Sequence, residues 1–240
     1  MGEVEGNTPQ WQYRRSVRDH VREPLGGAID RLDREREELH AERRALQRFA
    51  EDVAEITPAQ SVDGPMMLGE DPAAEKWTAV REAYRETIMA VDHYDAVYDE
   101  PMLVNVASEL NADIAESLRP ETRLPFTEPL QSVVHDAAIE AADRRERFAA
   151  QVESERESIE RADRTLCELI DRLGTTGLAA SDRHWFHDRV DDLVATRQER
   201  LQSRSVTRQD GHDLCGYVYA EESWTYPVLT AIARLRNSVE

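Results

Sequence analysis

Two histidines in the last third of the chain have the residue type and spacing that could bind a metal ion. His184-x-x-His187 places both imidazoles on one face of a helix, with Asp182 and Asp188 beside them, and zinc is bound by such nitrogen and oxygen ligands. Trp185 lies between the histidines, so one side of this helical turn is expected to be buried. A helix with one buried and one solvated side therefore explains the pair without a metal.

The remaining ligands of a zinc site would have to come from elsewhere in the chain. His212 and Cys215 would complete a set of three histidines and one cysteine if the chain folds back on His184 and His187, and zinc accepts that combination. A capped turn followed by a packed cysteine explains the same residues without a metal. We therefore predict no metal site, and keep as an alternative a metal-binding helical protein that uses His184, His187 and His212.

Two further charged groups match known metal sites only in part. Glu37-x-x-His40 has the spacing of a di-iron ligand pair, but such a site needs two of these motifs and the sequence holds one. The acidic cluster at residues 92–99 lacks the glycine and the terminal glutamate of a calcium loop. The sequence has no glycine-rich phosphate loop, no Gly-x-Ser-x-Gly turn and no cysteine–histidine nucleophile pattern. We therefore predict no catalytic residues, no cofactor and no enzymatic activity.

The charge of the chain is more informative than its motifs. Lys76 is the only lysine among 30 basic residues, against 49 acidic residues, and the formal net charge is -19. At molar salt the Debye length falls to about 3 Å, so repulsion between surface carboxylates is screened while their hydration keeps the protein soluble. The composition therefore indicates a halophilic protein from a haloarchaeon. The polar N-terminus carries no signal peptide and no apolar run is long enough to span a membrane, so we expect a cytoplasmic location.

The same charge pattern bears on the partners of the protein. Nucleic-acid binding needs a basic stripe, whereas the arginines here alternate with acidic residues, as in residues 34–38, which is typical of a solvated helix face. The sequence therefore weighs against nucleic acid, although a nucleic-acid-associated coiled-coil protein stays as a second alternative. Cys167 and Cys215 are distant in a chain without a secretion signal, so both thiols are expected to stay reduced.

Long amphipathic segments with few glycines and prolines indicate an all-α fold. Apolar residues recur in steps of three and four over residues 25–56 and again over residues 129–173, which predicts two long helices with coiled-coil-like seams. We predict that these two helices form a long antiparallel hairpin on which smaller helices pack. The smaller helices are predicted at residues 72–94, 101–118, 182–202, 210–220 and 227–238.

The first 24 residues are predicted to lie apart from the hairpin. Pro24, Gly26 and Gly27 weaken a helix at this point. We therefore expect an N-terminal arm or short helix at residues 1–24, followed by a single all-α domain over residues 25–240.

Charged residues inside the seams predict the register of the hairpin. The preferred register sets Leu25 against Leu173 and the seam residue Arg43 against Glu155, because an unpaired charge in a buried seam would be costly. A fallback register, shifted by one heptad, sets Arg36 against Glu155 instead.

Aromatic residues gather near the C-terminal end of the chain. Residues 214–229 include Tyr217, Tyr219, Trp224 and Tyr226. Their spacing fits a helix that packs on the hairpin, so we favour a core role over an exposed patch that binds a partner.

Two stretches connect the chain with a known family. They are residues 43–53, Arg-Arg-Ala-Leu-Gln-Arg-Phe-Ala-Glu-Asp-Val, and the pair of segments 216–220 and 226–235. In these stretches the chain resembles an uncharacterised haloarchaeal family of helical coiled-coil proteins, a domain of unknown function. The resemblance implies a habitat and a helical shape, and it implies no activity, cofactor or site residue.

The predicted function follows from long helical surfaces without a catalytic motif. We expect a non-enzymatic protein–protein interaction or scaffold protein of a halophilic archaeon, whose specific role and protein partner the sequence does not name. A homodimer is compatible with this prediction, because each long helix could also pair with a helix of a second molecule.

Overall fold

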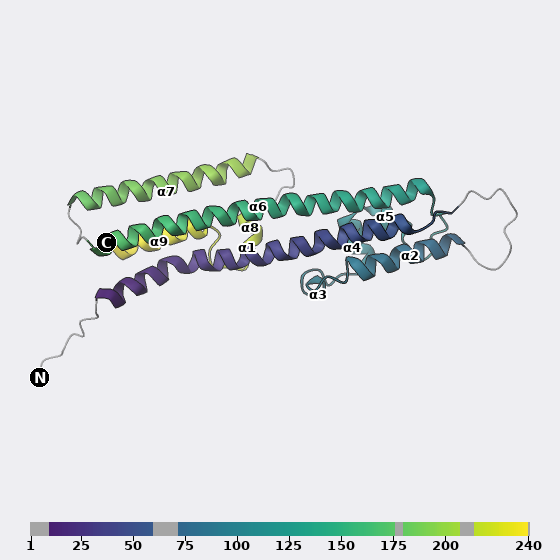
Figure 1. Ribbon diagram of the computed structural model, residues 1–240, viewed down its shortest axis with the longest axis horizontal. Coiled ribbons are helices and arrows are strands. Elements are labelled where there is room, and N and C mark those ends of the chain that lie inside the picture. Colours follow the sequence, from purple (N-terminus) through teal and green to yellow (C-terminus); the bar gives the residue numbers. More distant parts are fainter. Residues whose placement is uncertain (1–9, 60–71, 176–179, 207–213, 240) are drawn as a thin grey trace, which may run out of the picture. The chain divides into compact units, whose positions relative to one another are not determined.

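The structure is a computed structural model that describes residues 10–59, 72–175, 180–206 and 214–239. These residues form nine α-helices and no strand (Figure 1). The two longest, α1 (Gln10–Glu55) and α6 (Glu128–Thr175), pack against each other as a helical hairpin. The predicted all-α hairpin is therefore confirmed.

The chain divides into two compact units. The first unit, which we call the α7–α9 unit, comprises residues 1–35 and 151–240, and the second, the α2–α5 unit, comprises residues 36–150. Helices α1 and α6 contribute one half to each unit, because their apolar stripes run through their whole length and the smaller helices cover different halves.

Helix α1 runs through Pro24 without a break, so the predicted boundary at residue 24 is not a helix end. A proline lacks the N–H that would donate to the carbonyl four residues earlier. In the structure this carbonyl, of His20, accepts a hydrogen bond from Arg234 Nη1 at 2.8 Å, and Arg234 also pairs with Glu23. The proline is buried, so tertiary contacts compensate for the hydrogen bond that it removes.

The α7–α9 unit packs three helices on its part of the hairpin: α7 (Ala180–Val206), α8 (Leu214–Val218) and α9 (Pro227–Val239). Trp224, only 9% exposed, lies over Gly27, while Tyr217 is 52% exposed. The core role predicted for the aromatics is therefore confirmed for Trp224 and wrong for Tyr217. The largest fully buried side chains of this unit belong to Leu25, Leu32, Ile159, Leu166, Phe186 and Tyr219.

The α2–α5 unit packs α2 (Pro72–Thr87), α3 (Tyr94–Val97), α4 (Met102–Glu109) and α5 (Ala112–Ser117) on its own part of the hairpin. The helix predicted at residues 72–94 ends at Thr87, and the one predicted at 101–118 is two helices. Asn111 begins the second of these, because its side chain accepts a hydrogen bond from the Ile114 amide at 2.7 Å. The core contains Leu46, Phe49, Trp77, Tyr84, Leu118 and Phe126.

The preferred register of the hairpin is wrong. Arg43 pairs with Glu146 at 3.4 Å, nine residues before its predicted partner Glu155, and Asp33 pairs with Arg156 at 2.7 Å. The shift is in the direction of the fallback register. Glu155 instead accepts two hydrogen bonds from Arg197 of α7. Its charge is therefore compensated by a third helix, which a register predicted from two helices leaves out.

Candidate functional site

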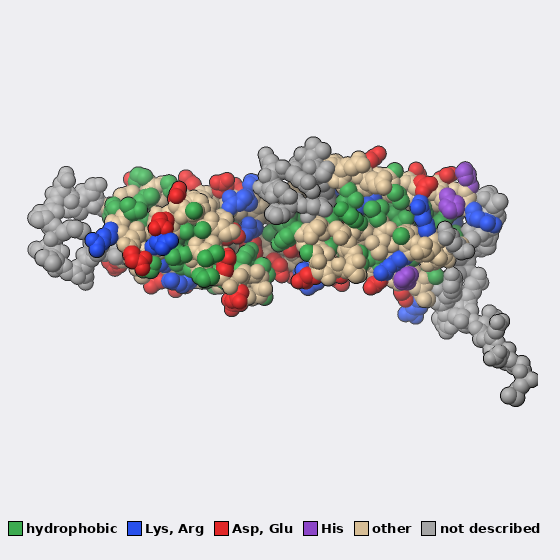
Figure 2. Space-filling view, turned by 180° about the vertical axis from the view of Figure 1, so that it is seen from behind, with side chains coloured by type: hydrophobic (Ala, Val, Ile, Leu, Met, Phe, Trp, Pro, Cys, Tyr) green, Lys and Arg blue, Asp and Glu red, His purple; other side chains and the backbone are tan. Residues whose placement is uncertain are grey.

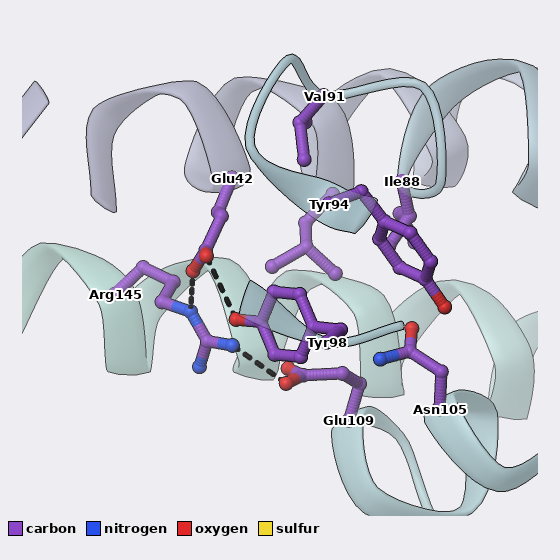
Figure 3. Close-up of a pocket in the computed structure, with 9 residues that line it drawn as sticks. Glu42, Ile88, Val91, Tyr94, Tyr98, Asn105, Glu109 and Arg145 are labelled. Atoms are coloured by element: carbon purple, nitrogen blue, oxygen red, sulfur yellow. Dashed lines mark hydrogen bonds and ion pairs between the residues drawn. The ribbon is translucent and has the colours of Figure 1, made fainter. Parts of the chain in front are cut away.

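The α2–α5 unit contains a half-buried polar cluster, which we call the Glu42 network, formed by Glu42, His93, Tyr98, Glu109 and Arg145. Glu42 comes from α1, Arg145 from α6 and Glu109 from the last residue of α4, while His93 and Tyr98 flank the short helix α3. Figure 3 shows Arg145 between the two carboxylates, with the Tyr98 hydroxyl directed at Glu42. The network therefore links both long helices to α3 and α4.

Glu42 is the centre of this network. Its Oε1 atom accepts a hydrogen bond from the Tyr98 hydroxyl at 2.7 Å and from His93 Nε2 at 3.0 Å, and its Oε2 atom accepts one from Arg145 Nε. Arg145 Nη2 donates to Glu109 Oε1 at 2.7 Å. Because an ionised carboxylate only accepts hydrogen bonds, this geometry assigns the hydrogen of His93 to Nε2.

The surroundings of Glu42 favour its ionised form. Burial raises the pKa of Glu42, but the charge of Arg145 and the hydrogen bonds from His93, Tyr98 and Arg145 outweigh burial, so its pKa lies below the ordinary value. Burial and the nearby Glu42 carboxylate raise the pKa of Tyr98, which therefore stays a hydrogen-bond donor. The network thus holds two carboxylates around one guanidinium.

A small cavity adjoins the network. Its volume is about 10 Å³, which is about the space one water molecule needs. Asn105 on its wall accepts a hydrogen bond from the Tyr84 hydroxyl at 2.6 Å and donates one to Glu100 at 2.7 Å. The polar groups around the cavity thus bind each other, and the space does not admit an organic substrate.

The α7–α9 unit buries a second polar group, the ion pair between Glu155 of α6 and Arg197 of α7. The two side chains are 0% and 2% exposed, and they share two hydrogen bonds of 2.5 and 3.1 Å. Burial lowers the pKa of Arg197, but the hydrogen bond and charge of Glu155 outweigh burial and raise it. Cys215 Sγ lies 3.9 Å from Arg197 Nη2, so the thiol is part of this interior and away from solvent.

Of the three histidines considered as metal ligands, the structure describes His184 and His187. His184 and His187 are exposed on α7, and His184 Nε2 lies 3.5 Å from Asp188. His212 lies outside the described residues. Across the residues that the structure describes, no three His, Cys, Asp or Glu side chains are arranged to hold a metal ion.

The structure also describes the two other charged motifs, Glu37-x-x-His40 and the acidic cluster at residues 92–99. Glu37 is exposed and His40 is partly buried, as expected for a helix face. Within the acidic cluster at residues 92–99, His93 turns inward to Glu42, whereas Asp95 is exposed. Both Cys167 and Cys215 are free thiols, as predicted.

Sequence reasoning did not identify Glu42, Tyr98 and Glu109 as parts of one site. The available signal was a charged residue inside an apolar stripe, because Arg145 and Glu155 both interrupt the stripe of α6. Such a residue predicts a buried partner. Its identity depends on helices that pack from elsewhere in the sequence.

The comparisons with known proteins identify a family and no activity. A family model described as a domain of unknown function (DUF7260) matches residues 23–240, so the chain belongs to this family. No curated protein and no solved structure matches the chain. None of the described helices combines the length and hydropathy needed to cross a bilayer.

Proposed function

We propose that the protein is a non-enzymatic protein–protein interaction or scaffold protein in the cytoplasm of a halophilic archaeon. The observation that carries this proposal is that the polar groups between the helices bind each other. The half-buried Glu42 network and the buried Glu155–Arg197 pair consist of ion pairs and hydrogen bonds that join helices, and the cavity beside the Glu42 network has room for about one water molecule. On this proposal, the long helices provide a surface that binds a protein partner, and no reaction takes place between them.

Exposed apolar side chains support an interaction role. Val104 of α4, Val133 of α6 and Tyr217 of α8 are each more than half exposed. Tyrosine in particular is enriched at protein interfaces, because it buries a large ring and keeps a polar hydroxyl. We expect a protein partner, and a homodimer is the simplest form of it.

The surface charge supports a protein partner over nucleic acid. On the face shown in Figure 2, acidic and basic side chains are interspersed without a wide basic area. Described arginines on both units pair with acidic side chains, for example Arg22 with Asp163 in the α7–α9 unit and Arg43 with Glu146 in the α2–α5 unit. An arginine already paired with a carboxylate is less available to a phosphate.

The test is the oligomeric state and partner content of the protein purified at molar salt. Light scattering after gel filtration measures the mass, and any stoichiometric partner is identified and rebuilt from purified components. Val104→Glu and Tyr217→Glu should weaken the assembly without changing the melting temperature, whereas Ala150→Glu, a change at an exposed position of α6, serves as the control. A monomer that reconstitutes with no partner would contradict the proposal.

A further inference from the structure

Helix α7 is attached to its unit by few apolar contacts. Among its side chains at residues 183–203, only Phe186, Val190 and Arg197 are buried. The shorter α9 buries five residues, Pro227, Val228, Ala231, Ile232 and Leu235. Because helices in proteins are stabilised mainly by packing of an apolar face, α7 has less holding it in place than α9.

Several other contacts of the described part of α7 are polar. The central one is the buried Glu155–Arg197 pair, in which the cost of removing two charges from water largely cancels their attraction. Arg236 pairs with Asp191 at the surface, where both side chains are more than 40% exposed, and such pairs contribute little. Arg172 lies over the Trp185 ring at 3.9 Å, which adds a modest cation–π contact.

Release of α7 would leave no charge buried without a partner. When α7 moves away, Glu155 and Arg197 both regain water, so the opened state avoids the penalty that a mutation of one partner would cause. Opening also uncovers Cys215, which is 1% exposed and lies 3.9 Å from Arg197 Nη2 in the closed state.

We propose that α7 is a releasable strap, which leaves the rest of the α7–α9 unit at a free energy below that of global unfolding and uncovers Glu155 and Cys215. This inference does not depend on the proposed function. A released α7 is rich in charged residues and lacks its packing partners, so we expect it to lose helical structure. The inference therefore predicts a local opening that two independent measurements can detect.

The first measurement is thiol labelling. Cys167→Ser leaves Cys215 as the single thiol of the chain, and its reaction with dithionitrobenzoate is followed at molar salt in low concentrations of urea. A strap predicts a labelling rate whose urea dependence is well below that of global unfolding, because release of one helix exposes only part of the surface that global unfolding exposes. A rate whose urea dependence equals that of global unfolding would overturn the proposal.

The second measurement is hydrogen exchange resolved by peptide mass spectrometry. We expect the amides of α7 to exchange at least about tenfold faster than those of α9. Equal protection of the two helices in the unmodified protein would overturn the proposal. Fast labelling of Cys215 while the amides of α7 stay protected would also overturn it, because α8 would then be the helix that moves.

A pair of variants tests the role of the ion pair. Glu155→Leu with Arg197→Met replaces two desolvated charges by apolar groups of similar size, so both labelling and α7 exchange should slow by about tenfold. Arg236→Gln, which removes only the surface pair with Asp191, should leave both rates nearly unchanged. If the double variant opens as fast as the unmodified protein while its global stability is equal or higher, the ion pair does not control the strap.

Discussion

The contact between Gly27 and Trp224 makes a quantitative prediction, because the adjacent Gly26 provides a matched control. Both glycines lie inside α1. A Cβ atom added at Gly26 meets nothing within 4 Å, whereas one added at Gly27 lies 3.2 Å from Trp224 Cζ2. Gly26→Ala should therefore stabilise the protein by about 0.5–1 kcal/mol, which is the usual advantage of alanine over glycine in a helix.

The same change at Gly27 should have the opposite sign. Carbon atoms normally approach to about 3.5–4.0 Å, so the Trp224 ring must move by a few tenths of an ångström. That ring is 9% exposed and packs on Tyr219 at a centroid distance of 5.2 Å, so it has little room to move. Overpacking of this kind costs about 1–3 kcal/mol, which exceeds the helix advantage and predicts a net loss of up to about 2 kcal/mol.

The assay is urea unfolding followed by circular dichroism at fixed molar salt, with midpoints compared at equal slope. A third variant tests the cause: in a Trp224→Leu background, Gly27→Ala should recover the gain seen for Gly26→Ala, because the crowding atom is gone. If Gly27→Ala stabilises the otherwise unmodified protein as much as Gly26→Ala does, Trp224 does not pack on this face of α1 and the reasoning fails.

Four further predictions concern charge. Arg197→Met alone should destabilise the protein by about 3–5 kcal/mol, because it removes the guanidinium that pairs with the buried Glu155, while adding Glu155→Leu should restore the stability of the unmodified protein or exceed it; chemical unfolding of the three proteins decides this. The pKa of Glu42 is lowered in the folded state. The contribution of Glu42 to stability is therefore present above its pKa in the unfolded chain, about 4.3, and is lost as the pH falls through its pKa in the folded protein. Glu42→Gln should flatten this dependence of stability on acid pH, and an unchanged dependence would contradict the lowered pKa. Helicity and melting temperature should fall when salt is reduced from molar to about 0.1 M, since repulsion within a chain of net charge -19 is then unscreened; constant values would remove the halophilic interpretation. Replacing His184 and His187 by Ala should leave the zinc content unchanged after dialysis, and a stoichiometric zinc ion lost in this variant would restore the metal-binding alternative.

Part of the fold could be predicted because helical periodicity is a local property. The apolar stripes of α1 and α6, the Pro72 start of α2 and the Pro227 start of α9 are written in neighbouring residues. The extension of α1 through Pro24 could not be predicted in the same way. Its compensation comes from Arg234, which lies 214 residues away in sequence from the His20 carbonyl that it binds.

The candidate site shows the same division. Charged residues inside the stripe of α6, Arg145 and Glu155, indicated that buried partners must exist, because a lone buried charge is costly. The sequence proposed Arg43 as the partner of Glu155, and the structure instead supplies Arg197 from α7. Arg43 pairs with Glu146, so the seam alone could not fix the register.

The sequence by itself determined the helical class, the two long helices and the acidic surface, since these depend on residue type and on spacing along one chain. Only the tertiary structure decided which charges pair and that Tyr98 and His93 donate hydrogen bonds to Glu42. It also placed Trp224 so close to Gly27 that a side chain there would be crowded. The physical reason is range: helix periodicity acts over three or four residues, whereas the partner of a buried charge is chosen by whichever helices pack around it, at any distance in sequence.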